Sequence, residues 1–219
     1  AQSVKKGVRA NGGTPREFCT ITVTDGIAMG HEGMKSSLIS REVIADSAEL
    51  TVRGHCYDAL VGIAGCDKSL PALMMSMVRL NVPSVFIYGG SILPGRYKGK
   101  DVTVVDVFEA VGKHSSGKMS SKELRKLELV ACPSAGACGG QFTANTMACV
   151  SEAIGLALPY SAGTPAPYEE RDKYAKESGK TVMNLLAKNI RPRDIAVSYT
   201  HLRAHETDSY LVCRLLLEK

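Results

Sequence analysis

The chain has 219 residues, a formal net charge of +5 and 44% hydrophobic residues, which is enough apolar material for one large domain with a packed core. Its lysines and arginines are scattered, so the positive charge indicates a solvated surface and argues against a nucleic-acid partner. No apolar run approaches the roughly 20 residues of a membrane span and no signal-peptide pattern opens the sequence, so we expect a soluble, cytoplasmic protein.

The seven cysteines include no Cys-x-x-Cys pair, and a chain of this length does not need covalent staples. We therefore expect reduced thiols in a reducing compartment. Because free cysteine is often buried, most of these residues are expected to be core thiols: Cys19, Cys56, Cys149 and Cys213.

Three strand-like segments, at about 18–24, 59–64 and 84–89, alternate with stretches of helical spacing. Each is almost entirely apolar, which is typical of strands covered on both faces. The fold class is therefore expected to be α/β, with a parallel or mostly parallel sheet flanked by helices. The remaining segments favour helices at about 70–75, 103–111, 120–130, 142–158 and 169–188, and Ser120 with Glu123 forms a capping-box pattern.

A further helix is expected between the first two strands, because four apolar residues recur there at intervals of seven, three and four. They are Leu38, Ala45, Ala48 and Val52. A long loop is expected after the third strand, where two glycine-containing pairs occur at 89–90 and 94–95.

The turn at 65–69 is the most informative stretch, because Cys66, Asp67 and Lys68 follow a buried strand directly. Asp25 follows the first strand-like segment, and a loop at 131–140 rich in cysteine and glycine opens a helix. Ligands of open α/β sheets bind where the carboxyl ends of the strands form a crevice. We therefore expect these three segments to converge at one end of the sheet.

The residue types suit metal chemistry, but each has an ordinary structural explanation. Carboxylates such as Asp25 and Asp67 are ligands that Mg²⁺ prefers, although Asp-Gly is more often a turn. Iron–sulfur clusters need thiolates from separate loops, whereas cysteines are commonly core residues. Lys68 is ordinarily a solvated residue, and Cys132 shares its loop with Cys138.

Together with 25–31, 40–47, 79–83 and 143–147, these segments resemble the dihydroxy-acid dehydratase family, relatives of 6-phosphogluconate and sugar-acid dehydratases. The resemblance runs from about residue 4 to residue 195. It implies an N-terminal α/β domain of a two-domain enzyme. It also implies that an iron–sulfur cluster, [2Fe–2S] or [4Fe–4S], is bound by Cys66 and Cys138, and Mg²⁺ by Asp25, Asp67 and a carbamylated Lys68.

The segments 29–34 and 88–95 favour the branch that acts on branched-chain acids. The implied reaction converts 2,3-dihydroxy-3-methyl carboxylic acids into 2-oxo acids in branched-chain amino-acid biosynthesis, with both metal centres acting as Lewis acids on the substrate hydroxyls. The substrate is a small molecule, and the parent enzyme is expected to be a homodimer. A sugar-acid (aldonate) dehydratase and a non-catalytic α/β metal-binding module are the alternatives.

In this family a first cluster cysteine precedes the matched region, and a C-terminal β-domain supplies a further Mg²⁺ carboxylate and a serine base. Residues 1–195 are therefore expected to be a domain truncated at both ends, without a catalytic base and inactive alone, and an organellar location stays open. Residues 196–219 contain no Gly or Pro and resemble translated sequencing-adapter DNA. We expect this tail to have no role in the fold, with a genuine amphipathic helix as the alternative.

Overall fold

A two-stranded parallel sheet lies at the centre of the structure, a computed structural model that describes residues 1–196. Strand β1 (Leu60–Ala64) pairs with β2 (Ser84–Tyr88) in a register that aligns the two ends. A parallel bridge between Phe86 and Ala157 extends the sheet by one position on the far side of β2. The expected α/β class with a small parallel sheet is confirmed.

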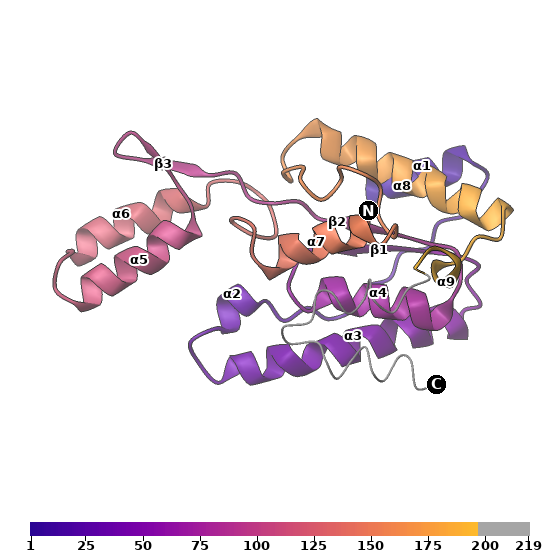
Figure 1. Ribbon diagram of the computed structural model, residues 1–219, viewed down its shortest axis with the longest axis horizontal. Coiled ribbons are helices and arrows are strands. Elements are labelled where there is room, and N and C mark those ends of the chain that lie inside the picture. Colours follow the sequence, from indigo (N-terminus) through magenta and orange to yellow (C-terminus); the bar gives the residue numbers. More distant parts are fainter. Residues whose placement is uncertain (197–219) are drawn as a thin grey trace.

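Helices cover both faces of this sheet (Figure 1). One face carries α1 (Gln2–Ala10) and α8 (Glu169–Ala187), and the other carries α3 (Gly33–Gly54) and α4 (Ser69–Leu80). Helix α7 (Thr143–Ala153) packs on α4 and β2. Two short helices complete the body of the molecule: α2 (Asp25–Ala28) and α9 (Pro192–Ile195).

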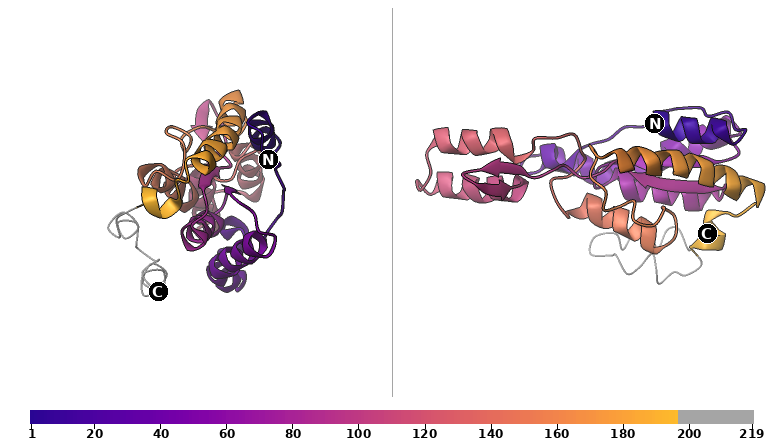
Figure 2. Two further views of the ribbon diagram at one scale, coloured as in Figure 1. Left: turned by 90° about the vertical axis from the view of Figure 1, so that its right-hand side faces the viewer. Right: turned by 90° about the horizontal axis from the view of Figure 1, so that it is seen from above.

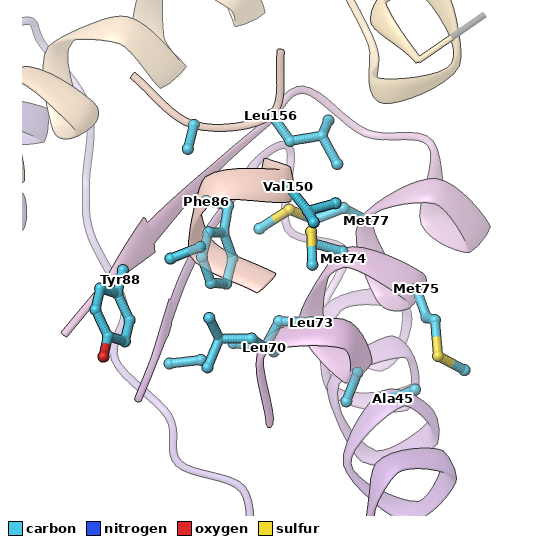
Figure 3. Packing of buried hydrophobic residues seen from close by; sticks show 14 of the residues in the cluster. Ala45, Leu70, Leu73, Met74, Met75, Met77, Phe86, Tyr88, Val150 and Leu156 are labelled. Atoms are coloured by element: carbon cyan, nitrogen blue, oxygen red, sulfur yellow. The ribbon is translucent and has the colours of Figure 1, made fainter. Parts of the chain in front are cut away.

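The alternation of side chains along β2 explains why the two helical layers are needed. Val85 and Ile87 pack in a cluster with α1 and α8, while Phe86 and Tyr88 face the cluster built with α3, α4 and α7. Figure 3 shows leucine and methionine side chains of α4 packed beside Phe86. Every residue of β2 is buried, as predicted, whereas Ile63 of β1 is exposed.

Helices α1 and α8 touch through backbone, because glycines stand at their crossing. A Cβ added at Gly7 would lie 2.0 Å from the carbonyl oxygen of Lys176, and one added at Gly179 would lie 2.3 Å from that of Val4. The pair of glycines therefore sets the distance between the two helices.

A smaller lobe projects from the body (Figures 1 and 2). It contains the hairpin of β3 (Gly95–Tyr97) and β4 (Lys100–Val102), followed by α5 (Val104–Ser115) and α6 (Ser121–Ala131). Its own small core is formed by Val102, Ala110, Leu127 and Ala131. The Ser120 side chain accepts a hydrogen bond from the N–H of Glu123, which confirms Ser120 as the N-cap of α6. The Glu123 carboxylate accepts from the Ser120 hydroxyl and from Lys98, so the reciprocal half of the predicted capping box is not formed.

The prediction of a strand at 18–24 is wrong: this segment forms no strand in the structure. A strand requires a hydrogen-bonded neighbour, and residues of this segment and of β1 instead line a common cavity of about 810 Å³. Thr20 is held through its side chain, whose oxygen lies 2.5 Å from the Ser47 hydroxyl of α3.

Several smaller expectations also fail. The helix expected over 142–158 ends at Ala153, and part of the loop expected after β2 is the hairpin of the lobe. Leu38 is 53% exposed, whereas Ala45, Ala48 and Val52 are buried as expected. Three cysteines expected in the core are exposed, because they lie in a loop, at a helix end and on the outer side of α7: Cys19, Cys56 and Cys149.

No helix within residues 1–196 is both long and apolar enough to cross a membrane. From residue 197 onward the predicted tail, including Cys213, lies outside the described residues.

Candidate functional site

Two segments that are distant in sequence meet in a buried ion pair. Asp25 is the first residue of α2, and Lys68 immediately precedes α4 in the turn after β1. The Lys68 Nζ atom lies 3.2 Å from Asp25 Oδ2, and the two side chains are 15% and 7% exposed. The carboxyl end of β1 therefore carries a charged cluster, as the turn sequence predicted.

Asp67 adds a second carboxyl group to this cluster. Burial, followed by the hydrogen-bonding contact and the negative charge of Asp25, raises the pKa of Asp67 above its ordinary value of 3.8. The charge of Lys68 and a hydrogen bond with Thr143, the first residue of α7, act in the opposite direction. The two carboxyl groups disfavour each other's charge, and the Lys68 ammonium offsets part of that effect.

Asp25 keeps its charge more readily than Asp67. Burial alone would raise its pKa, but hydrogen bonds with Ser37 and Asp67 and the charge of Lys68 outweigh burial and lower it. The Ser37 hydroxyl on α3 donates to Asp25 Oδ1. Asp25 is therefore the carboxylate that faces the ammonium, and the pKa of Asp67 is shifted in the opposite direction to that of Asp25.

Cys66 lies beside this cluster in the chain and is buried at 9% exposure. Its backbone is fixed by Ser69, whose hydroxyl accepts a hydrogen bond of 3.1 Å from the Cys66 N–H and donates one of 2.9 Å to the Cys66 carbonyl. The turn that carries Cys66 and Asp67 is thus closed by a side chain of the helix that follows it.

The loop of Cys138 is attached to the same end of the sheet. The N–H of Ala137 donates to the carbonyl of Gly90, and the N–H of Ile92 donates to the carbonyl of Cys138, both at 2.8 Å. A Cβ added at Gly65 would lie 2.9 Å from the Cβ of Ala137, so the two cysteine loops abut. The structure therefore brings together all three predicted segments.

The thiol of Cys138 is half-buried, and burial raises its pKa. Hydrogen bonds from the backbone N–H groups of Gly140 and Phe142 oppose that effect, because they favour the thiolate. Backbone donors of this kind also occur around the sulfur ligands of iron–sulfur clusters. The surroundings of Cys138 thus fit a sulfur ligand. Cys132, in contrast, is exposed at the end of α6.

Arg171 of α8 supports the loops around the site and was not predicted from the sequence. This buried guanidinium donates to the carbonyls of Tyr88 at 2.9 Å and Ser161 at 2.7 Å, and to the carbonyl of Thr164. The loop that it holds joins the Gly90 turn through a 2.9 Å hydrogen bond from the Ala166 N–H to the Ser91 carbonyl.

Ser37 and Thr143 were also missed as site residues, because serine and threonine within helices have many ordinary uses: no motif marks Ser37, and Thr143 was noted only as part of the segment 143–147. His31, which was left as a loop residue, is exposed and closes a local turn: its Nε2 lies 2.9 Å from the Ile27 carbonyl oxygen. Among residues 1–196, no group of three His, Cys, Asp or Glu side chains is arranged to hold a metal ion. A metal at this site needs Lys68 or residues beyond those described.

Comparison with known proteins gives consistent results. Residues 1–207 match the family described as dihydroxy-acid/6-phosphogluconate dehydratase N-terminal. The chain is 95% identical over 195 residues to a dihydroxy-acid dehydratase of Pelagibacter ubique, and 83% identical over 195 residues to one of Parvibaculum lavamentivorans. Identity to a dihydroxy-acid dehydratase of Metallosphaera sedula is 55% over 195 residues.

These alignments cover 89% of this chain but 34 or 35% of each relative. The chain therefore spans about a third of the length of the curated relatives that it matches.

Proposed function

The chain belongs to the dihydroxy-acid/6-phosphogluconate dehydratase N-terminal family, and on that basis we propose that it is part of a hydro-lyase that converts 2,3-dihydroxy-3-methyl carboxylic acids into 2-oxo acids. The observation that carries this proposal is the buried cluster of Asp25, Asp67 and Lys68 at the end of β1, with Cys66 adjacent in the chain. Because the chain spans about a third of its relatives, the activity is proposed for the whole protein.

The donor set of the cluster suits Mg²⁺, provided that Lys68 is modified. Two carboxylates in contact favour a bound divalent cation, whereas the Lys68 ammonium repels one. When the neutral Lys68 amine adds CO₂, an N–C bond forms and a proton is released, which leaves a carbamate. Lys68 then supplies anionic oxygen, and Asp25, Asp67 and this carbamate would hold Mg²⁺, which polarises substrate oxygens when bound.

Cys66 and Cys138 are the proposed ligands of an iron–sulfur cluster. They lie in abutting loops, and the Cys138 sulfur accepts backbone hydrogen bonds from Gly140 and Phe142. Iron binds the thiolate, so ligation would require the Cys138 thiol to lose its proton, a step that its raised pKa opposes. Asp67 follows Cys66 directly, so one turn would orient ligands for both centres.

The remaining parts of the proposal concern the whole protein. We assign no general base among the described residues, so this chain alone is expected to be inactive. A cytoplasmic location and a homodimeric parent enzyme are part of the same proposal. A sugar-acid dehydratase is not favoured, since the three relatives above are all named dihydroxy-acid dehydratase.

The test is an assay of the full-length protein that contains this segment, purified and reconstituted with iron, sulfide and Mg²⁺. We expect it to convert 2,3-dihydroxy-3-methylbutanoate into the 2-oxo acid, and Cys66→Ser and Asp67→Asn each to abolish most of the activity. Turnover of gluconate with none of the branched substrate would identify the sugar-acid alternative. Turnover of neither substrate, in a protein that retains metal, would favour a non-catalytic module.

A further inference from the structure

Asp25 presents its two carboxylate oxygens to different partners. Oδ1 accepts the hydrogen bond from the Ser37 hydroxyl, whereas Oδ2 lies 3.2 Å from Lys68 Nζ. Ser37 is fully buried on α3, and Asp25 is 5% exposed. Among the described residues, Ser37 is the only serine, threonine or tyrosine whose hydroxyl donates to Asp25.

Such a donor has a physical role, because the last torsion of an aspartate side chain has a broad, nearly two-fold energy profile. A fixed hydroxyl at one oxygen selects one orientation and leaves the second oxygen free for another partner. The helix α3 provides a rigid support for that hydroxyl, since the two turns that follow it are buried at Ser40, Ile44 and Ala45.

We infer that Ser37 is a positioning residue that orients Asp25 Oδ2 toward the Lys68 turn and thereby sets the affinity of this site for a divalent cation. The inference rests on the proposed function, because it assigns a metal to the cluster of Asp25, Asp67 and Lys68. The inference adds Ser37 to the site, a residue of α3 that no sequence motif marks and that lies outside the segments carrying Asp25, Asp67 and Lys68. Ser37 would act through its hydrogen bond to Asp25 and not as a metal ligand.

The test uses Mn²⁺, a spectroscopic substitute for Mg²⁺, bound to the full-length protein in buffer with bicarbonate and followed by electron paramagnetic resonance. We expect Ser37→Ala to weaken Mn²⁺ binding by about 10- to 100-fold, the range typical of residues that orient metal ligands. Ser37→Thr keeps the hydroxyl and is expected to retain most of the affinity.

Ser76→Ala is the matched control. Ser76 is also fully buried in a helix, but its hydroxyl donates to the backbone carbonyls of Ala45 at 3.1 Å and Ala72 at 2.9 Å. This variant loses a buried hydroxyl without touching Asp25, so its Mn²⁺ affinity is expected to match that of the unmodified protein. Should Ser37→Ala fail to fold, Ser37→Thr can be compared with Ser37→Val, because threonine and valine have the same shape and differ in the hydroxyl. Weaker Mn²⁺ binding is then expected only for Ser37→Val.

Two outcomes would overturn the inference, and they are distinguishable. Equal Mn²⁺ affinity in the unmodified protein and in folded Ser37→Ala or Ser37→Val would remove the role of Ser37 and leave the proposed function intact. Failure of the unmodified protein to bind Mn²⁺ at all would remove the metal site itself, and the role of Ser37 with it.

Discussion

Asp25 and Asp67 are neighbours with opposite pKa shifts. The pKa of Asp25 is lowered, so its charge stabilises the fold above the ordinary value of 3.8, and this contribution is lost as the pH falls. The pKa of Asp67 is raised by burial and by Asp25, so the folded state holds its proton more tightly than the unfolded state. The stabilisation of the fold that comes from the Asp67 proton is therefore complete below pH 3.8, and it is lost as the pH rises through the raised pKa of Asp67.

We therefore predict that Asp67→Asn stabilises the metal-free chain at pH 7, because asparagine fills the same space without the buried charge. The advantage should shrink toward pH 4, because the buried charge of Asp67 is removed as the pH falls through its raised pKa. Urea unfolding at the two pH values measures this difference. Asp101→Asn, at an exposed carboxylate of the hairpin, is the control and should change stability by less than about 0.5 kcal/mol at either pH. A loss of stability in Asp67→Asn at pH 7 would contradict the assigned shift.

Arg171 gives a prediction about the loops around the site. Arg171→Leu leaves the carbonyls of Tyr88, Ser161 and Thr164 without their donor, so we expect a loss of about 2–4 kcal/mol in the free energy of unfolding. Arg193 also donates to backbone carbonyls, those of Val78 and Arg79, but it is exposed. Arg193→Leu should therefore cost less than about 1 kcal/mol in the same denaturation experiment. Equal losses would show that burial of Arg171 does not matter.

Among the helices, the crossing of α1 and α8 depends most clearly on single residues. Gly7→Ala places a Cβ against the carbonyl oxygen of Lys176, and Gly179→Ala places one against that of Val4. Because backbone must move in both cases, we expect each variant to lose about 1–3 kcal/mol of stability, measured by chemical denaturation.

Gly112→Ala in α5 is the control for these variants, because nothing lies within 4 Å of its added Cβ. Alanine is the better helix former, so this variant should gain about 0.5–1 kcal/mol. A loss in all three variants would mean that glycine is needed for some reason other than the close approach of the helices.

The elements that could be predicted from the sequence are those that depend on interactions between residues close together in the chain. The cap of α6 at Ser120 depends on residues three positions apart, and the buried face of α3 depends on helical spacing. Residues 18–24 have the composition of a strand, but whether they pair is decided by a neighbour in space. The hairpin of β3 and β4 was missed because each strand has only three residues.

The same distinction applies to the site. The turn after β1 marks Asp67 and Lys68 directly, and the topology of a parallel sheet predicts where they lie. Their contacts with Asp25, Thr143 and Ser37 depend on how α2, α7 and α3 pack. No spacing within the chain encodes those contacts, because they depend on how the helices pack in three dimensions.

On the scale of the whole molecule, residues 1–196 form a body around the sheet and a lobe with a separate core (Figure 1). The chain leaves the body after β2 and returns through residues 132–142, the segment that carries Cys138. Its attachment to Gly90 and Ile92 places that return against the turn that follows β2. The cysteine loop thus belongs to the junction between body and lobe.

That the C-terminal tail has no role in the fold remains a prediction from its composition. Deleting residues 197–219 is expected to change the free energy of unfolding by less than about 0.5 kcal/mol, the range of neutral surface changes. Thermal and urea unfolding of the two forms test this, with far-ultraviolet circular dichroism to confirm equal folding. A loss above about 2 kcal/mol would mean that these residues are a genuine structural element.

The ion pair of Lys68 and Asp25 implies an order of assembly for a site of the proposed kind. An ammonium held by a carboxylate does not react with CO₂, so Lys68 must first leave Asp25 and lose a proton. In the proposed site the addition of CO₂ would follow this loss of a proton, so carbamate formation would depend on pH and on dissolved CO₂. In the structure the Lys68 ammonium stands beside Asp25, where the proposed carbamate would instead present anionic oxygen, so the proposed modification would turn an attraction between these side chains into a repulsion that a cation must offset.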